Sequence, residues 1–264
     1  MRENNAPLGV FDSGLGGLTI VREILKQLPQ ESVLYFADTA HVPYGSRDPE
    51  ELRGFAFQIT AYLVKRQCKM IIIACNTSTA LAYDFLRSNF NVPLVGVIEP
   101  GVSRALQVTA NGKIGIIGTL ATIQSGVYQK KLKAVAEEVV ALSCPPFVEL
   151  VEKGKLRGLE TEEIVAGCLA PLQAREIDTL ILGCTHYPFL RESITRFLGP
   201  KVKIVDPAEE TVRQTARLLK ANSLSAGNQK PRYSYFSSKN AYDFKIKGSA
   251  FLGRDLGTVK EIHL

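Results

Sequence analysis

Two cysteines follow apolar segments at points where the chain turns polar. Cys75 comes directly after the apolar run 70–74, and Cys184 follows the apolar run 180–182 and one glycine. Each run has the composition of a buried parallel strand, and ligands of parallel sheets bind beyond the carboxyl ends of the strands. A helix that starts there directs backbone N–H groups at the cysteine, which lowers the pKa of its thiol. The two thiols are therefore candidates for proton transfer or nucleophilic chemistry.

The five cysteines of the chain do not share this setting equally. A single cysteine at a strand end is more often inert packing, because free cysteine is among the most buried residue types. Two cysteines in matching settings, each followed by threonine and other polar residues, favour chemistry instead. Cys68, Cys144 and Cys168 lack the setting, and we expect them to be structural.

A carboxylate and an imidazole lie where they could assist the two thiols. Asp12 and Ser13 follow the apolar run 8–11 and open a glycine-rich turn. This turn is not a dinucleotide loop, because Thr19 stands where the third glycine is needed and no Gly-Lys-Ser/Thr follows. Asp12 is either a helix cap or a group that orients a thiol near Cys75. His186 is either a hydrogen-bonded structural residue or the acid–base partner of the nearby second thiol.

Further polar side chains follow the same strand ends and could bind a small anionic or zwitterionic ligand. These hydrogen-bonding candidates are Ser13, Asn76, Thr77, Thr119, Thr122 and Thr185. Such donors suit a small carboxylate or an amino acid. Two thiols on opposite sides of one carbon would suit stereochemical inversion, in which one removes a proton and the other returns one. The residues Pro-Tyr-Gly at 43–45 predict a rigid turn, and taken alone they indicate no function for it.

The elements that must position these groups have the order of an α/β protein. Eight short apolar runs alternate with helical patterns, which predicts parallel sheets with right-handed crossovers. The predicted strands are 8–11, 32–36, 70–74, 93–97, 114–117, 139–142, 179–182 and 202–205. The predicted helices are 18–28, 49–66, 78–88, 101–108, 128–138, 161–174 and 207–220. Residues 223–231 have the composition of a loop, and the pattern of 233–264 favours no element strongly.

The chain also contains an internal sequence repeat at an offset of about 107 residues. Gly9 and Gly115, Cys75 and Cys184, and Glu99 and Asp206 keep their order at nearly the same offset. This predicts two similar four-stranded α/β halves, related by a pseudo-twofold axis, with the active site in the cleft between them. The alternative is that any two α/β domains share such features, although this would not align the cysteines.

Composition excludes several classes of protein. The chain has 264 residues, which is enough for one large or two ordinary domains. No segment is apolar enough to span a membrane, and residues 1–7 resemble neither a signal nor a transit peptide. We therefore expect a cytoplasmic protein with reduced cysteines, and the lack of C-x-x-C spacing with three histidines predicts no metal site. The net charge of +6 comes mainly from residues 219–264, so no nucleic-acid partner is expected.

Four motifs together resemble one family. They are Phe-Asp-Ser-Gly-Leu-Gly-Gly at 11–17, Pro-Tyr-Gly at 43–45, Ala-Cys-Asn-Thr-Ser at 74–78 and Leu-Gly-Cys-Thr-His-Tyr-Pro at 182–188. In this order they are similar to the motifs of the cofactor-independent, two-cysteine aspartate/glutamate racemase family, in its glutamate-specific branch. The resemblance runs from about Leu8 to the C-terminus. The two cysteine motifs alone would indicate only the wider superfamily that includes aspartate and hydantoin racemases.

The resemblance implies an activity and a role for each residue. It implies interconversion of L- and D-glutamate without a cofactor, with Cys75 and Cys184 as proton donors and acceptors. Asp12 and His186 would assist them, and Glu152 would be an auxiliary acid, although Glu149 would share its helical face. The implied substrate-binding residues are Asp12, Ser13, Tyr44, Gly45, Asn76, Thr77, Thr185 and His186, and the hydrogen-bonding candidates Thr119 and Thr122 are kept with them.

The resemblance also implies interleaved domains and a biological role. Residues 1–98 with 208–264 would form the first domain, and 99–207 the second. D-glutamate made by such an enzyme supplies bacterial peptidoglycan synthesis, and we expect a homodimer. Three other functions stay open: a racemase for aspartate, a two-lobed amino-acid binder without activity, and a protein that binds a partner through its basic C-terminal segment.

Overall fold

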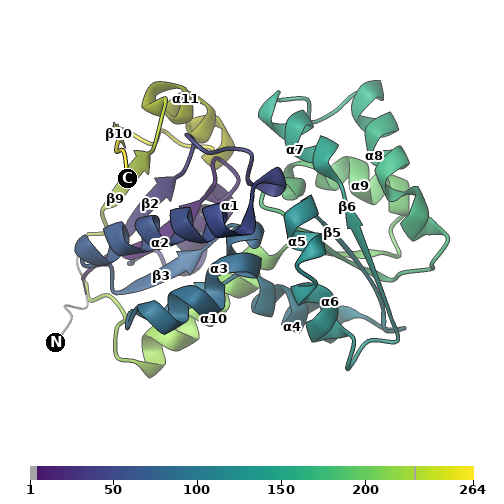
Figure 1. Cartoon of the computed structure of the whole chain (residues 1–264), viewed down its shortest axis with the longest axis horizontal. Coiled ribbons are helices and arrows are strands. Elements are labelled where there is room, and N and C mark those ends of the chain that lie inside the picture. The colour runs from purple at the N-terminus through teal and green to yellow at the C-terminus, as the bar shows by residue number, and fades with distance from the viewer. Residues whose placement is uncertain (1–4, 229) are drawn as a thin grey trace. The chain divides into compact units, whose positions relative to one another are not determined.

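The computed structural model describes residues 5–228 and 230–264, and the chain divides into two compact units (Figure 1). Unit 1 comprises Met1–Val97 and Ala208–Leu264, and unit 2 comprises Ile98–Pro207. Each unit has its own parallel sheet flanked by helices, which confirms the prediction of two α/β domains. Within the described ranges, no helix has the length and apolar character that a membrane crossing requires.

The sheet of unit 1 has the strand order β10-β9-β2-β1-β3-β4, and its pairings are all parallel. Its strands are β1 (Leu8–Asp12), β2 (Val33–Ala37), β3 (Met70–Ile73), β4 (Leu94–Gly96), β9 (Tyr233–Ser237) and β10 (Val259–Glu261). The last two strands were not predicted, and they make this sheet six-stranded rather than four-stranded. The C-terminal segment therefore completes the sheet that begins with β1.

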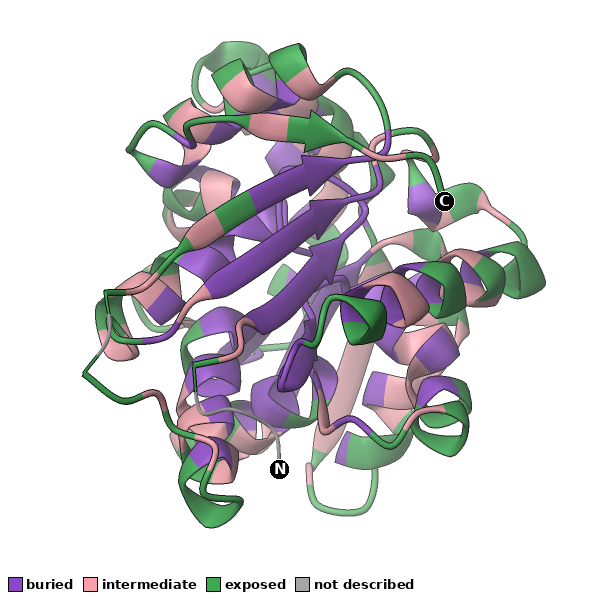
Figure 2. Ribbon diagram, turned by 90° about the vertical axis from the view of Figure 1, so that its left-hand side faces the viewer, coloured by how far each residue is buried: buried purple, intermediate pink, exposed green. Residues whose placement is uncertain are grey.

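Alternating side chains of these strands build two cores, one on each face of the sheet. Val10, Tyr35 and Ile72 belong to a core shared with α1, α10 and α11, whereas Phe11 and Ile73 belong to one shared with α2 and α3. The helices are α1 (Leu18–Gln27), α2 (Pro49–Lys65), α3 (Asn76–Asn89), α10 (Pro207–Ala221) and α11 (Ala241–Leu252). Figure 2 shows the central strands buried between helices whose outer faces are exposed, whereas the edge strand β10 is largely exposed. Burial on both faces explains why the strands are continuous apolar runs.

The sheet of unit 2 has the strand order β6-β5-β7-β8 and is also parallel. Its strands are β5 (Lys113–Gly118), β6 (Glu138–Ser143), β7 (Thr179–Gly183) and β8 (Lys203–Val205). Its helices are α4 (Ile98–Val108), α5 (Leu120–Gln124), α6 (Val127–Leu132), α7 (Pro145–Glu152), α8 (Leu159–Gln173) and α9 (Arg191–Leu198). The order repeats the four strands β2-β1-β3-β4 of unit 1, so both units share one topology.

Two predictions about the second half were wrong. The helix expected at 128–138 ends at Leu132, because Glu138 already pairs with Lys113 in the sheet and the chain must leave the helix to reach it. The echo of Glu99 with Asp206 fails as well. When the two sheets are aligned strand by strand, Leu94 of β4 corresponds to Ile204 of β8. Glu99 lies further along the chain, in α4. The repeat is carried by the strands and the cysteines rather than by those acidic residues.

Candidate active site

Strand register gives the two cysteines the same position in their units. In unit 1, Cys75 lies two residues beyond the β3 residue that pairs with Phe11 of β1. In unit 2, Cys184 lies two residues beyond the β7 residue that pairs with Ile117 of β5. Each thiol thus follows the strand next to the first strand of its unit, at the carboxyl edge where parallel sheets bind ligands.

Cys75 is the N-cap residue of α3, an unusual position for a cysteine. Its side chain is 5% exposed, and its Sγ accepts a hydrogen bond of 3.4 Å from the backbone N–H of Ser78. Asn76 and Thr77, in the first turn of α3, are buried beside it. The first turn of a helix carries partial positive charge, which stabilises negative charge that develops on a group at this position.

Asp12 ends β1 as a fully buried carboxylate. Its Oδ2 accepts hydrogen bonds from the backbone N–H groups of Gly14 (3.1 Å) and Gly17 (3.0 Å). A Cβ atom at Gly17 would lie 2.4 Å from the Asp12 Cβ, so only glycine allows this approach. Asp12 therefore organises the glycine-rich turn, but it is not the cap of α1, because the N-cap residue of that helix is Gly17. Its charge also acts on Tyr44, as does that of Cys75, so the three groups share one environment.

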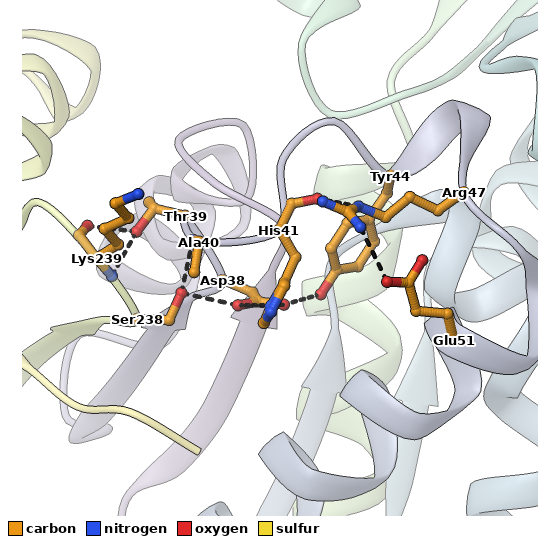
Figure 3. A network of polar contacts seen from close by, with 9 residues as sticks. All are labelled: Asp38, Thr39, Ala40, His41, Tyr44, Arg47, Glu51, Ser238 and Lys239. Carbon is orange, nitrogen blue, oxygen red and sulfur yellow. Dashed lines mark hydrogen bonds and ion pairs between the residues drawn. The ribbon is translucent and has the colours of Figure 1, made fainter.

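Tyr44 joins the Cys75 region to a buried carboxylate that sequence reasoning missed. Burial and the neighbouring Asp38 raise the pKa of Tyr44 well above its usual value, so the phenol stays neutral and donates to Asp38 Oδ2 at 2.5 Å. Asp38 also accepts hydrogen bonds from Ser238 Oγ (2.7 Å) and contacts His41 Nδ1 (2.9 Å), as Figure 3 shows. Gly45, in the 3-10 turn Tyr44–Ser46, is half-buried.

Asp38 follows β2 directly, just as Asp12 ends the adjacent strand β1. Its position after a predicted strand was the sequence signal for it. Its partner Ser238 follows β9, about 200 residues further along the chain, and β9 was not predicted. The network therefore depends on the C-terminal segment, whose strand β9 brings Ser238 next to Asp38.

The second cysteine has an imidazole and a carboxylate beside it. Cys184 Sγ lies 3.7 Å from Nδ1 of His186, and Nε2 of His186 lies 2.7 Å from Oε1 of Glu152. Burial alone would lower the pKa of His186, but its hydrogen bonds to Cys184 and Glu152 and their charges raise it to about 10. The imidazole is thus protonated at neutral pH. Glu149, the other acidic candidate, is exposed and pairs with Lys153.

The threonines predicted in unit 2 lie near the ends of β5 and β7. Thr119 is the N-cap of α5, and its Oγ1 accepts from the backbone N–H of Thr122 at 3.2 Å and lies 2.9 Å from the Thr122 Oγ1. Thr119 is half-buried and Thr122 fully buried. Thr185 is 9% exposed, between Cys184 and His186. These hydroxyls therefore border the same strand ends as the second thiol.

Comparison with known proteins identifies the family. The sequence profile of the Asp/Glu/hydantoin racemases matches residues 9–215. The chain is 44% identical to a protein of Listeria monocytogenes named glutamate racemase, over 97% of this chain and 98% of that one. The chain belongs to the Asp/Glu/hydantoin racemase family.

Solved structures of this racemase family share the fold of the whole chain. A glutamate racemase isoform from Bacillus anthracis superposes with a TM-score of 0.93 at 37% identity, covering 99% of each chain. Glutamate racemase from Francisella tularensis in complex with D-glutamate also gives a TM-score of 0.93, at 35% identity and 98% coverage of each chain. Among the described residues of this family member, no cluster of three or more metal-binding side chains occurs.

Proposed function

We propose that this protein is a glutamate racemase that interconverts L- and D-glutamate by two-base proton transfer at the α-carbon. The observation that carries the proposal is the matching register of Cys75 and Cys184. Inversion at one carbon needs a base on one face and an acid on the other. Two equivalent thiols supply both, and they exchange roles when the reaction runs in reverse.

Each thiol has a neighbour that can stabilise negative charge on its sulfur. For Cys75 this neighbour is the first turn of α3, whose Ser78 N–H donates to the sulfur. For Cys184 it is the protonated His186, held by Glu152. The α-proton of an amino acid is far less acidic than a thiol, so the rest of the site must stabilise the developing carbanion with oriented donors and by excluding water.

We assign these donors by their burial near the two thiols and by the motifs shared with the family. The proposed substrate-binding residues are Asp12, Ser13, Tyr44, Gly45, Asn76, Thr77, Thr119, Thr122, Thr185 and His186. Most of them offer hydroxyl, amide or backbone groups, His186 offers an imidazole and Asp12 a carboxylate that accepts hydrogen bonds. Together they suit the two carboxylates and the ammonium group of glutamate. Asp12 would hold the glycine-rich turn against the substrate while influencing Tyr44 and Cys75.

The activity is tested by incubating the protein with each enantiomer of glutamate and of aspartate, with no cofactor added, and separating the products by chiral chromatography. Glutamate should racemise and aspartate should not, because the relatives of high identity carry the name glutamate racemase. Racemisation of aspartate alone would contradict the proposed substrate.

The cysteine variants separate catalysis from binding. Cys75→Ala and Cys184→Ala should each abolish detectable racemisation while the circular-dichroism spectrum and the binding of glutamate persist. Near wild-type turnover in either variant would exclude the two-base mechanism. A protein that binds glutamate but never racemises it, even as wild type, would instead be an amino-acid binder.

The wider role follows from the same proposal. We infer a cytoplasmic enzyme that supplies D-glutamate for peptidoglycan synthesis and acts as a homodimer. Depletion of the protein in its bacterial host should be rescued by external D-glutamate, and sedimentation should give twice the mass of the chain. Rescue by L-glutamate alone would contradict the physiological role.

A further inference from the structure

The loop 38–47 carries two of the proposed substrate-binding residues, and the C-terminal segment is hydrogen-bonded to it (Figure 3). Ser238 lies directly after β9 and is 5% exposed. Its hydroxyl accepts a hydrogen bond from the backbone N–H of Ala40 at 2.8 Å and donates one to Oδ1 of Asp38 at 2.7 Å. One side chain therefore joins the end of β9 to both the backbone and a buried carboxylate of the loop.

The Asp38 carboxylate also binds Tyr44. Its Oδ2 accepts a hydrogen bond from the Tyr44 hydroxyl at 2.5 Å, so its two oxygens connect the C-terminal segment with the tyrosine. Tyr44 is itself buried, in a cluster with Leu52 and Cys75. All of these residues belong to unit 1. A continuous series of hydrogen bonds and packing contacts thus leads from Ser238 to the first candidate thiol.

We propose that Ser238 is a positioning residue for racemisation, which acts through Asp38 to hold Tyr44 in the geometry that substrate binding requires. This role rests on the proposed function of the protein. The backbone N–H of Asp38 donates to the Asp12 carbonyl at 2.9 Å, which fixes the backbone but not the carboxylate. His41 contacts the carboxylate through Nδ1 at 2.9 Å, but it lies in the same loop and its side chain is 35% exposed. Ser238, at the end of a strand, is therefore the group that fixes the carboxylate relative to the sheet.

The kinetic constants of Ser238→Ala separate positioning from a purely structural role. The variant removes a hydrogen bond to a charged group, so we expect KM for L- and D-glutamate to rise about tenfold. Because the proposed role of Tyr44 is to bind substrate rather than to move a proton, kcat should change little. Partial loss of folded protein would instead lower kcat at an unchanged KM, and that result would overturn the assignment.

A double-mutant cycle tests the route through the carboxylate. Tyr44→Phe removes the hydroxyl that donates to Asp38, so in this background Ser238→Ala should raise KM by less than about twofold. An equal rise in KM in both backgrounds would show that Ser238 does not act through the tyrosine, and it would overturn the proposal.

Two neighbouring hydroxyl groups provide controls. Ser237, the last residue of β9, has a buried hydroxyl that finds no hydrogen-bond partner within the described part of the chain. The Thr39 hydroxyl donates to the carbonyl of Lys239 and accepts from its N–H at 3.0 Å, so it attaches the loop at a second point. Ser237→Ala and Thr39→Val should each leave KM within about twofold of the wild-type value. A rise as large as that of Ser238→Ala in either control would assign the effect to general packing or loop attachment and contradict the proposal.

Amide hydrogen exchange tests the contact without turnover or substrate. In Ser238→Ala the N–H of Ala40 loses its acceptor, so a peptide that covers 38–47 should exchange faster than in the wild type, with an unchanged circular-dichroism spectrum. Unchanged exchange would overturn the proposed role of Ser238. Faster exchange in a protein whose wild type does not racemise glutamate would support the contact and contradict the proposed function alone.

Discussion

At the scale of single residues, the two thiols have equivalent positions but different surroundings. Cys75 relies on the start of a helix, with the carboxylate of Asp12 in the same environment. Cys184 faces a protonated imidazole held by a carboxylate. The first environment combines helix N–H groups with a negative charge, whereas the second places a full positive charge beside the sulfur. We therefore expect the two directions of racemisation to respond differently to pH and to substitution.

The Glu152–His186 contact gives a prediction with a matched control. Glu152→Gln removes the charge that helps to raise the pKa of His186, so the imidazole should lose its proton at lower pH than in the wild type. The titration of His186, followed by NMR, should move down from about 10 toward the ordinary value. Glu149→Gln, on the same helix but exposed and paired with Lys153, should leave it unchanged. Equal shifts in both variants would contradict the assignment of Glu152.

The same group predicts how stability depends on pH. The folded-state pKa of His186, about 10, lies above its ordinary value of 6.5. Protonation therefore stabilises the fold fully below about 6.5, and this contribution is lost as the pH rises through about 10. In urea unfolding, the difference in unfolding free energy between wild type and His186→Asn should shrink over that range. A difference that grows with pH would contradict a raised pKa.

Single-residue predictions from sequence succeeded where partners lie close to a motif. The pairing of Cys184 with His186 follows from two residues of spacing, and strand ends placed Cys75 and Asp12. Asp38 was missed because its hydrogen bond to Ser238 joins positions about 200 residues apart. Spacing along the chain carries no information about such a pair.

At the scale of elements, close packing at the turn after β1 holds Asp12 in place. Gly17 is the N-cap residue of α1, and a Cβ there would lie 2.7 Å from the Tyr35 hydroxyl as well as against Asp12. That hydroxyl itself donates to the Gly14 carbonyl at 2.6 Å. The turn is therefore built from a glycine that allows close approach and two side chains that occupy the space.

A pair of glycine substitutions tests this packing. Gly17→Ala should destabilise the protein by about 1–3 kcal/mol and lower racemisation, because the added methyl group must displace Asp12 or Tyr35. Gly54→Ala is the control, because Gly54 lies inside α2 with no atom within 4 Å of an added Cβ. There alanine should stabilise the helix by about 0.5–1 kcal/mol. Urea unfolding measures both, and a neutral Gly17→Ala would contradict the packing argument.

Sequence patterns located most elements, and the failures have physical causes. Apolar runs identified all eight strands of the repeated topology. Burial on both faces makes most of these runs continuous, although β6 and β8, at the edges of their sheet, are less buried. β9 has the sequence Tyr-Ser-Tyr-Phe-Ser and β10 the sequence Val-Lys-Glu, so neither strand is a continuous aliphatic run. The helix predicted at 128–138 was too long, because local helix propensity carries no information about the pairing of Glu138 in β6.

At the scale of the whole molecule, the chain builds two units that exchange their connecting helices. After β4 it enters α4, which contacts β7 and β8 of unit 2, and after β8 it enters α10, which joins the core of unit 1. Unit 2 is thus one continuous segment with its own sheet. The repeat of strand order was predictable from the cysteine spacing, whereas the six-stranded sheet of unit 1 was not.

This organisation predicts that residues 98–207 fold when expressed alone. The segment contains all four strands of its sheet and the helices that flank it. It should show an α/β circular-dichroism spectrum and one cooperative urea transition. A matched segment that ends at 183, and therefore lacks β8 and α9, should remain unfolded. An unfolded 98–207 would show that unit 2 depends on unit 1.

The central claim is that two thiols act on one α-carbon, and isotope exchange in deuterated water tests it most directly. Starting from L-glutamate, the D-glutamate formed early should carry deuterium at the α-carbon, because the second thiol delivers a proton that has exchanged with solvent. The recovered L-glutamate should carry almost none, because the first thiol returns the hydrogen it removed. Starting from D-glutamate should give the mirror result. Product without deuterium, or equal deuterium in product and recovered substrate, would contradict the two-base mechanism.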